Sequence, residues 1–193
     1  MERCLVMHVE SLDVRQLTET DAQAIAELLV SVWRKPGKNV EYRRRQMKSL
    51  GDSYDGPDKL APRSFIIRES ARIIAHATFL SRMITTSTGP LRIAGLARVC
   101  TDPNFRGQKL GEKVVRAVFE LVDKKLFPYA LFQTTPEVQP FYEKMGACIV
   151  KNPIINSMNG DLHVSPFWDK VIMRYPQDGD WPQGVVDLCG PGY

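Results

Sequence analysis

Residues 96–125, LARVCTDPNFRGQKLGEKVVRAVFELVDKK, restrict the possible folds more than any other part of the chain. The segment opens with a partly β-branched run that predicts a strand, and Asp102-Pro103-Asn104 then predicts a turn. Behind the turn, apolar residues recur at the spacing of one helical face, at Leu110, Val114, Val118, Leu121 and Val122. The segment therefore predicts a strand, a glycine-containing turn and a helix in direct succession.

The turn at residues 106–111 has the composition of a phosphate-binding site. The first N–H groups of a helix have no partner within it, and the helix dipole adds partial positive charge there. Gly107 and Gly111 let a bulky anion approach the backbone, and Arg106 and Lys109 add full positive charge. The patterns of P-loops and of dinucleotide-binding turns are both absent. By itself, the turn leaves two interpretations open: a phosphate site, or a strand-to-helix turn whose glycines only allow close packing.

Two motifs resemble those of the GCN5-related N-acetyltransferase (GNAT) superfamily. Arg106-x-x-x-x-Gly111 is similar to the family's acyl-CoA motif, Q/R-x-x-G-x-G/A, with Lys109 in place of the middle glycine. Residues 135–146, TPEVQPFYEKMG, resemble the family's fourth helix, F-Y-x-K-x-G. The resemblance implies one α/β (α+β) domain over residues 1–193, with an acyl-CoA-binding core at 90–150. Its sheet would be mixed and mostly antiparallel, with one splayed parallel pair and flanking helices.

The resemblance also implies which residues bind acetyl-CoA, the co-substrate of the family. Backbone groups of residues 99–101 would bond the pantetheine amides, and the turn would hold the pyrophosphate. Thr135 stands where the family often has an asparagine that contacts the cofactor. The implied cofactor-binding residues are Val99, Cys100, Thr101, Arg106, Gly107, Gln108, Lys109, Leu110, Gly111 and Thr135.

The reaction implied is direct attack of an amine on the thioester. Tyr142 matches the family tyrosine that protonates the departing thiolate as general acid, although a packed aromatic is the alternative. The strand glutamate that many members use as base is missing, because Gly95 and Ala97 occupy its expected positions. His76 is a candidate base, and a satisfied half-buried histidine is the alternative.

The C-terminal segment, residues 176–193, is too apolar and glycine-rich for a free tail, so we expect it to fold near the acceptor; a surface strand is the alternative. Asp180, Trp181 and Tyr193 are then acceptor-side candidates. Trp33 is another, with core packing as its alternative. Asp180-Trp181 and the Ala75-His76 strand resemble, more distantly, a branch that contains the aminoglycoside 2'-N-acetyltransferases and the rhizobial nodulation acyltransferase.

These observations predict an N-acetyltransferase that acetylates a primary amine of a small molecule, with an aminosugar as candidate. Two alternatives stay open: a protein or peptide N-acetyltransferase, and a CoA-binding protein with little catalysis. The net charge of +4 fits a polyanionic cofactor. No basic stripe with interleaved aromatics indicates a nucleic-acid partner, and the run Arg43-Arg44-Arg45 with Lys48 predicts a solvated helix face.

Other sequence features bear on metal binding, disulfides, cellular location and oligomeric state. The four cysteines lack C-x-x-C spacing, so neither a metal site nor a disulfide framework is expected. No apolar run reaches membrane-spanning length, and no apolar leader opens the chain, so a cytoplasmic protein without membrane contact is expected. The segment 171–175 either ends the sheet or pairs with a second copy, which leaves a homodimer open.

The remaining elements follow from local patterns. A first strand is expected at 8–17, a helix with a capping box that starts at Thr20, and a second helix at 40–50. Strands at 64–68, 72–86 and 91–101 should form antiparallel hairpins, and 129–134 should return parallel to the third. Thr135 is expected to cap the next helix, Gly146 to end it, and Asn159-Gly160 to form a hairpin turn.

Overall fold

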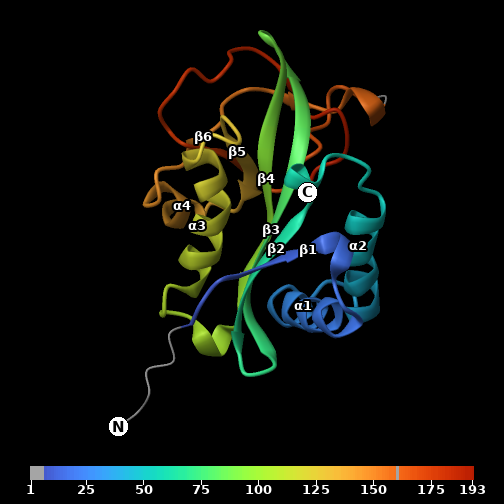
Figure 1. Ribbon diagram of the computed structural model, residues 1–193. Coiled ribbons are helices and arrows are strands. Elements are labelled where there is room, and N and C mark those ends of the chain that lie inside the picture. The colour runs from blue at the N-terminus through green and yellow to red at the C-terminus, as the bar shows by residue number, and fades with distance from the viewer. Residues whose placement is uncertain (1–6, 160) are drawn as a thin grey trace. The chain divides into compact units, whose positions relative to one another are not determined.

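The computed structural model describes residues 7–159 and 161–193, and these form a mixed sheet with helices (Figure 1). The strands are β1 Glu10–Asp13, β2 Arg63–Glu69, β3 Arg72–Thr86, β4 Gly89–Thr101, β5 Ala130–Thr134, β6 Cys148–Ile149, β7 Ile154–Ile155, β8 Val171–Tyr175 and β9 Val186–Asp187. The α-helices are α1 Glu19–Val32, α2 Val40–Asp52, α3 Leu110–Asp123 and α4 Gln139–Glu143. Short 3₁₀ helices lie at Val14–Gln16, Asp58–Leu60, Pro103–Phe105 and Ser157–Asn159.

The strands follow the hydrogen-bonded order β1-β2-β3-β4-β5-β8-β6. β1–β2, β2–β3, β5–β8 and β6–β8 pair antiparallel, whereas β4 and β5 pair parallel. A second parallel pairing joins β7 to β9, and β9 also pairs with β3. The α/β class and the mostly antiparallel sheet with its parallel β4–β5 pair are confirmed.

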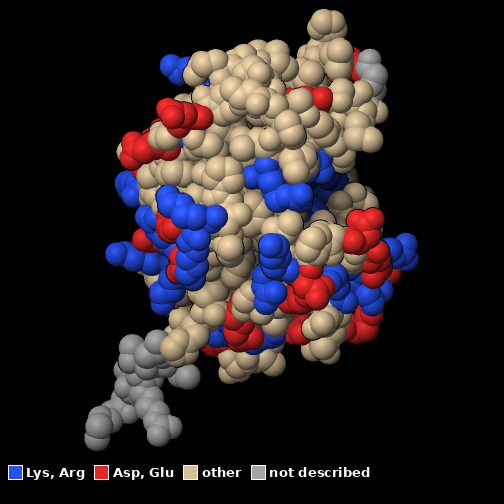
Figure 2. Space-filling view, turned by 45° about the horizontal axis from the view of Figure 1, so that its top comes forward, with Lys and Arg blue, Asp and Glu red and all other residues tan. Residues whose placement is uncertain are grey.

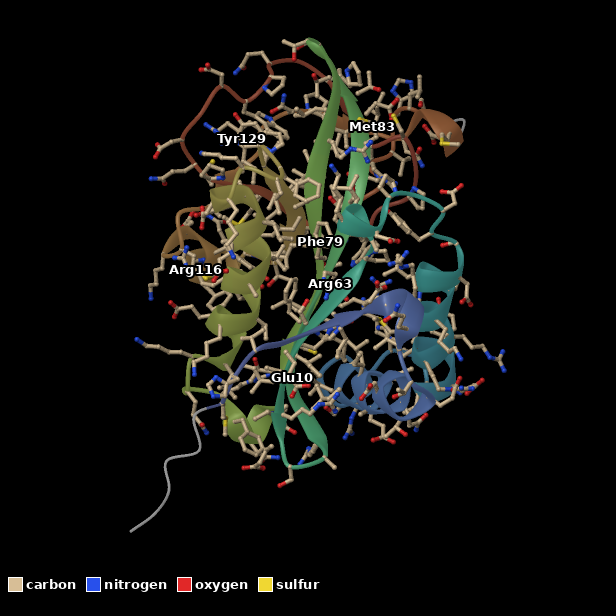
Figure 3. All side chains as sticks on the ribbon, in the orientation of Figure 1. Glu10, Arg63, Phe79, Met83, Arg116 and Tyr129 are labelled. Atoms are coloured by element: carbon tan, nitrogen blue, oxygen red, sulfur yellow. The ribbon has the colours of Figure 1, made fainter. Side chains whose placement is uncertain are left out.

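The chain packs as two compact units, each built from two separate stretches of sequence. Unit 1 comprises Met1–Leu80 and Arg98–Val118, and unit 2 comprises Ser81–Ala97 and Phe119–Tyr193. β3, β4 and α3 each run through both units. β3 passes from Phe79, whose ring is buried, to Met83, which is exposed (Figure 3).

Unit 1 is organised by α1 and α2, which lie side by side (Figure 1). α1 begins after Thr18, whose hydroxyl accepts the N–H of Asp21 at 3.0 Å, and α2 begins after Asn39, whose side chain accepts the N–H of Tyr42 at 2.9 Å. Both helices bury apolar side chains against the strands of the unit. The buried cluster consists of Val14, Ile25, Leu28, Leu29, Met47, Ile66, Ile73 and Cys100.

Unit 2 has apolar groups on both faces of β5. On one face, Phe119 of α3 stacks on Tyr175 with ring centroids 4.0 Å apart and lies 6.0 Å from Phe132. Leu131 points to the opposite face, because successive side chains of a strand alternate. There it joins residues of the C-terminal segment in a cluster of Ile84, Ile93, Tyr129, Leu131, Val150, Ile154, Phe167, Trp181, Val186 and Leu188.

Charged side chains lie mainly at the surface, and several of them form ion pairs. Lys124 bonds Glu120 on α3 at 2.9 Å, and Arg45 bonds Glu41 on α2 at 2.7 Å. On the face drawn in Figure 2, patches of Lys and Arg alternate with patches of Asp and Glu. None of the helices in the described residues is long and apolar enough to span a membrane.

Three expected boundaries were wrong. α1 is capped by Thr18 rather than Thr20, and the first strand is only four residues long before a 3₁₀ turn. Residues 136–138 form a turn, so α4 begins at Gln139 instead of directly after Thr135. Gly146, with φ of 90°, does follow the end of α4 as expected. Gly160 of the expected Asn159-Gly160 hairpin lies outside the described residues.

The stacked Phe119–Tyr175 pair makes a testable contribution to stability. Phe119 is wholly buried, so Phe119→Ala removes its burial and leaves a cavity, and we expect a loss of about 3–5 kcal/mol in the free energy of unfolding. Met83→Ala, an exposed control on β3, should change it by less than about 0.5 kcal/mol. Urea denaturation measures both; a loss below about 1 kcal/mol in Phe119→Ala would contradict the assigned packing.

Candidate active site

The backbone of β4 leaves regular strand geometry at Arg98, which has a φ of 51°. The left-handed conformation is unfavourable for a residue with a Cβ, so an interaction with another residue must stabilise it. The carbonyl of Arg98 accepts a hydrogen bond from Nδ1 of His76 at 2.9 Å. Because a carbonyl can only accept, the proton lies on Nδ1, and Nε2 accepts from the Ser64 hydroxyl at 3.1 Å. His76 thus fixes β4 at this point.

The His76 ring has no exposed surface. Burial, and to a smaller extent the Arg98 cation, lower the pKa of His76 to about 4, so the ring is neutral at pH 7. Both ring nitrogens already have partners within unit 1. This geometry favours the alternative given above, a satisfied histidine, over a base that meets the acceptor amine.

Residues 99–101, the expected pantetheine strand, follow directly. Val99 and Thr101 are half-buried, whereas Cys100 is buried in the core of unit 1. Burial raises the pKa of the Cys100 thiol, so Cys100 is not a thiolate nucleophile. Asp102 ends the strand: its N–H donates to the Ile74 carbonyl at 2.8 Å, and its buried carboxylate pairs with Arg72. Asp102, the first carboxylate after β4, is therefore already engaged in a structural ion pair.

The turn at 106–111 presents an exposed surface with the features of an anion site. Arg106, Gly107, Gln108 and Lys109 are exposed, and Leu110 is buried at the start of α3. Gly107 has a φ of 81° with open space around its Cα. Lys109 has a φ of 59°, so a lysine takes the left-handed conformation that glycine adopts easily. Lys109 therefore has a conformation that a glycine at the same position would also adopt.

Helix α3 adds donors to this turn. The N–H of Lys113 is the first that reaches back to the turn, where it bonds the Lys109 carbonyl at 3.1 Å. The N–H groups of residues 110–112 have no acceptor within the helix, as at any helix start. With the cations of Arg106 and Lys109, these donors fit a pyrophosphate group.

The parallel pairing of β4 and β5 is short. It covers Ala94 with Ala130 and Gly95 with Leu131, and no further pair of these strands occurs in the described part of the chain. The carbonyl of Leu131, at the end of this pairing, accepts a hydrogen bond from the Tyr193 hydroxyl at 3.0 Å. Tyr193 therefore lies where the two strands stop pairing.

Tyr142 lies on α4 in unit 2 and is 5% exposed. Its ring centroid is 4.6 Å from that of Phe132 and 4.9 Å from that of Phe141. Thr135 precedes α4, and its carbonyl accepts the N–H groups of Val138 and Gln139. A hydrogen bond from the Thr135 side chain lowers the pKa of Glu137, so this side chain already has a partner within its own turn.

The tail candidates differ in position. Trp181 is buried, its ring meets Tyr129 edge-on at 5.0 Å, and its indole N–H donates to Asn152 at 2.9 Å (Tyr129 is labelled in Figure 3). Asp180 is exposed. Arg82 donates to the carbonyls of residues 188 and 191, so the tail is fixed against unit 2 as expected for a folded segment. Trp33, at the end of α1, packs against the core of unit 1.

Sequence reasoning missed one feature, which concerns the basic run of α2. Arg44, Arg45 and Lys48 pair with surface carboxylates, as a solvated face requires. Arg43 is instead buried, on the same helical face as Met47 and Gly51. The spacing of four residues between these three positions was the available signal.

The surface also contains a hollow of about 630 Å³ along α1 and α2, and none of the predicted site residues lines it. Glu19, Glu27 and Glu41 line it, so it does not suit a phosphate-bearing cofactor. In the described residues, no group of three or more His, Cys, Asp or Glu side chains is arranged to hold a metal ion.

The end of β4, the turn with its left-handed Lys109 and the N–H groups at the start of α3 have the features expected of a protein that binds acyl-CoA. The sequence model described as "Acetyltransferase (GNAT) domain" matches residues 13–150. The chain belongs to the GNAT family and is an acetyltransferase. A search of curated proteins finds no match.

Solved structures of the same fold are similar to this chain. Escherichia coli ElaA has a TM-score of 0.58 at 16% identity, covering 87% of this chain and 98% of that one. A GNAT-family acetyltransferase from Staphylococcus aureus Mu50 has a TM-score of 0.58 at 14% identity, covering 89% and 100%. Glucosamine-6-phosphate N-acetyltransferase from Arabidopsis thaliana has a TM-score of 0.55 at 20% identity, covering 72% and 90%.

The burial of His76 predicts a pH-dependent stability. Its pKa is lower in the folded chain than in the unfolded one, so between pH 6.5 and about 4 the unfolded chain binds one more proton. Stability from this group is therefore complete above pH 6.5 and decreases as the pH falls, by about 1.4 kcal/mol per unit. His76→Gln should lack this part of the dependence. Urea titrations of both proteins from pH 7.5 to 4.5 measure the difference; parallel profiles would contradict it.

The left-handed Lys109 predicts separate effects on stability and on CoA binding. Lys109→Gly removes backbone strain and should raise the free energy of unfolding by up to about 1 kcal/mol, whereas Lys109→Ala should not. Both variants lose a cation and should bind CoA roughly fivefold more weakly by calorimetry. Lys124→Ala, at the far end of α3, should bind CoA like the wild type. Unchanged affinity in both Lys109 variants would place the phosphates elsewhere.

Proposed function

We propose that the protein transfers an acetyl group from acetyl-CoA to a primary amine of a small molecule. The observation that carries this proposal is the turn at residues 106–111, where Lys109 keeps a glycine-like conformation beside exposed cations and free helix N–H groups. This geometry suits the pyrophosphate of CoA, and the family uses acetyl-CoA as co-substrate.

The residues have distinct roles in this proposal. Arg106, Lys109 and the N–H groups at the start of α3 hold the pyrophosphate, and backbone groups of residues 99–101 bond the pantetheine. Acetyl-CoA supplies an acyl thioester that is open to attack by a neutral amine. Tyr142 holds, at its phenolic oxygen, the proton that the leaving thiolate takes.

The chain offers no carboxylate base on β4, since residues 89–101 contain no acid and Asp102 is paired with Arg72. His76 is neutral and buried with both nitrogens engaged. We therefore propose that the amine loses its proton to water before attack. Turnover should then rise with pH until the acceptor amine is deprotonated.

The fixed tail supports a small acceptor. Gln133 of β5 donates to the main-chain oxygen of Tyr193 at 2.8 Å, and Arg82 of β3 bonds the tail at Leu188. In unit 2, these contacts keep residues 188–193 against the strands, and we expect a segment fixed in this way to leave less room for an extended peptide. An aminosugar is the candidate acceptor, in line with the resemblance of Asp180-Trp181 to the aminoglycoside branch. One structural neighbour acts on glucosamine-6-phosphate. A cytoplasmic location and a homodimer remain predictions.

A panel of amines tests the proposal. Acetyl transfer from acetyl-CoA to aminosugars, aminoglycosides, polyamines, amino acids and short peptides is read by mass spectrometry of the acceptor. Turnover on a small amine supports the proposal, whereas turnover on peptides alone would replace it with the protein acetyltransferase. CoA binding without turnover on any member would favour a binding protein.

Tyr142→Phe tests the general acid. The variant keeps the ring contacts with Phe132 and Phe141 but loses the phenolic proton, so kcat should fall by about 10²–10⁴-fold while CoA affinity stays within twofold. Tyr129→Phe, at another buried tyrosine of unit 2, serves as the control and should keep wild-type turnover. Equal kcat in the two variants would remove Tyr142 from the mechanism.

A further inference from the structure

On the buried face of helix α2, Arg43 occupies a position where an apolar residue is expected. Its buried face consists of Arg43, Met47 and Gly51, and Met47 is part of the core of unit 1. Arg43 is only 9% exposed. A guanidinium in such a position is costly unless each N–H finds an acceptor.

Arg43 is incompletely satisfied. Its Nη1 donates to Gln46 at 3.2 Å, but its buried Nε has no hydrogen-bond partner among the described residues. The Arg45 side chain, two residues along, is exposed and paired with Glu41. Of these two arginines of α2, only the inward-facing Arg43 therefore has a buried N–H group without an acceptor.

A second arginine, Arg98 of β4, lies close enough to Arg43 to be affected by its charge. Arg98 is half-buried, and its Nη1 is likewise buried without a partner among the described residues. Burial and the nearby Arg43 cation lower the pKa of Arg98 to about 10, so the Arg98 guanidinium is still charged at neutral pH. Neither forms an ion pair with a carboxylate in residues 7–159 and 161–193.

Two neighbouring cations repel each other, and each of these two also has an unpaired N–H group. An anion between them would offset the repulsion and would accept hydrogen bonds from these N–H groups. Guanidiniums bind phosphate and carboxylate through paired N–H bonds, which suits this arrangement. The backbone supports it, because His76 holds the left-handed Arg98 at its carbonyl. The phosphates of CoA are assigned to the exposed turn at 106–111, which leaves the buried pair for another ligand.

We propose that Arg43 and Arg98 bind an anionic group, phosphate or carboxylate, of the amine acceptor. This inference rests on the proposed function, since Arg98 directly precedes residues 99–101, the strand assigned to pantetheine. An acceptor whose anion meets the arginines would thus have its amine beside the acyl end of the cofactor. The substrate class is therefore an amine that also carries an anionic group.

Matched acceptor pairs test the inference. Glucosamine is compared with glucosamine-6-phosphate, ethanolamine with phosphoethanolamine, and glycinamide with glycine. In at least one pair, the wild type should have a kcat/KM at least roughly tenfold higher for the anionic member. Which pair shows this preference distinguishes phosphate from carboxylate. Turnover without any preference for the anionic member would overturn the inference and leave the proposed function standing.

Variants connect the preference to the two arginines. Arg43→Gln and Arg98→Gln should abolish it while CoA affinity, measured by calorimetry, stays unchanged. Arg45→Gln removes a charge from the same helix and should keep the preference. Arg43→Met completes the apolar face of α2 and should raise Tm by roughly 2–4 °C, so loss of the preference in that variant is not due to unfolding. A preference that survives in Arg43→Met would overturn the inference.

Binding of inorganic phosphate gives a readout without turnover. Calorimetry at low salt, with CoA bound, should detect phosphate on the wild type and on Arg45→Gln but not on Arg43→Met. If phosphate binds in this way and no amine is acetylated, the anion site stands and the proposed function fails. Equal phosphate binding by wild type and Arg43→Met would contradict the site.

Discussion

The hydrogen bond between the His76 ring and the Arg98 carbonyl determines the course of β4 next to the proposed site. It holds a non-glycine residue in the left-handed region, and the strand that is assigned to pantetheine starts one residue later. The guanidinium of the same residue is affected by the charge of Arg43 on α2. The bond needs a proton on Nδ1, and burial keeps the ring otherwise neutral, so a polar side chain inside the sheet has a structural reason.

Two positions keep residues that reduce stability. Lys109 occupies a left-handed turn position at a cost of about 1–2 kcal/mol relative to a regular conformation. Arg43 leaves a buried N–H without an acceptor, which costs about 1–3 kcal/mol. Both residues are cations, and both lie where a negatively charged ligand is proposed. Such costs are common at binding sites, because groups that are arranged for a ligand are unsatisfied without it.

The features predicted from sequence were those with strong local signals. The strand–turn–helix of residues 96–125 and the hairpins of β2, β3 and β4 follow from periodicity and turn residues, and the structure has them. The helix starts were less reliable, because Thr18 and Thr20 both have capping chemistry and only packing selects Thr18. Pro136 permits a helix start, but the chain makes a turn there first.

The environments of His76 and Arg43 could not be predicted in the same way. The partner of His76 is a carbonyl 22 residues away, at a left-handed residue that is not a glycine, so no local pattern indicates it. Arg43 lies in a run of basic residues whose other members are solvated, and that run concealed the one inward position. The helical spacing to Met47 and Gly51 was the clue, and it has meaning only once one face of α2 is known to be buried.

The division of the chain into two interleaved units has a consequence for synthesis on the ribosome. Unit 1 needs residues 98–118 in addition to its first 80, so its core is incomplete until a segment made much later has emerged. β1, β2 and β3 can pair early, but β4 and α3 close the unit only when residue 118 has emerged. The nascent chain therefore exposes part of an unfinished apolar core for several seconds at ordinary elongation rates of about 5–20 residues per second. Contacts between such distant segments also slow folding after release.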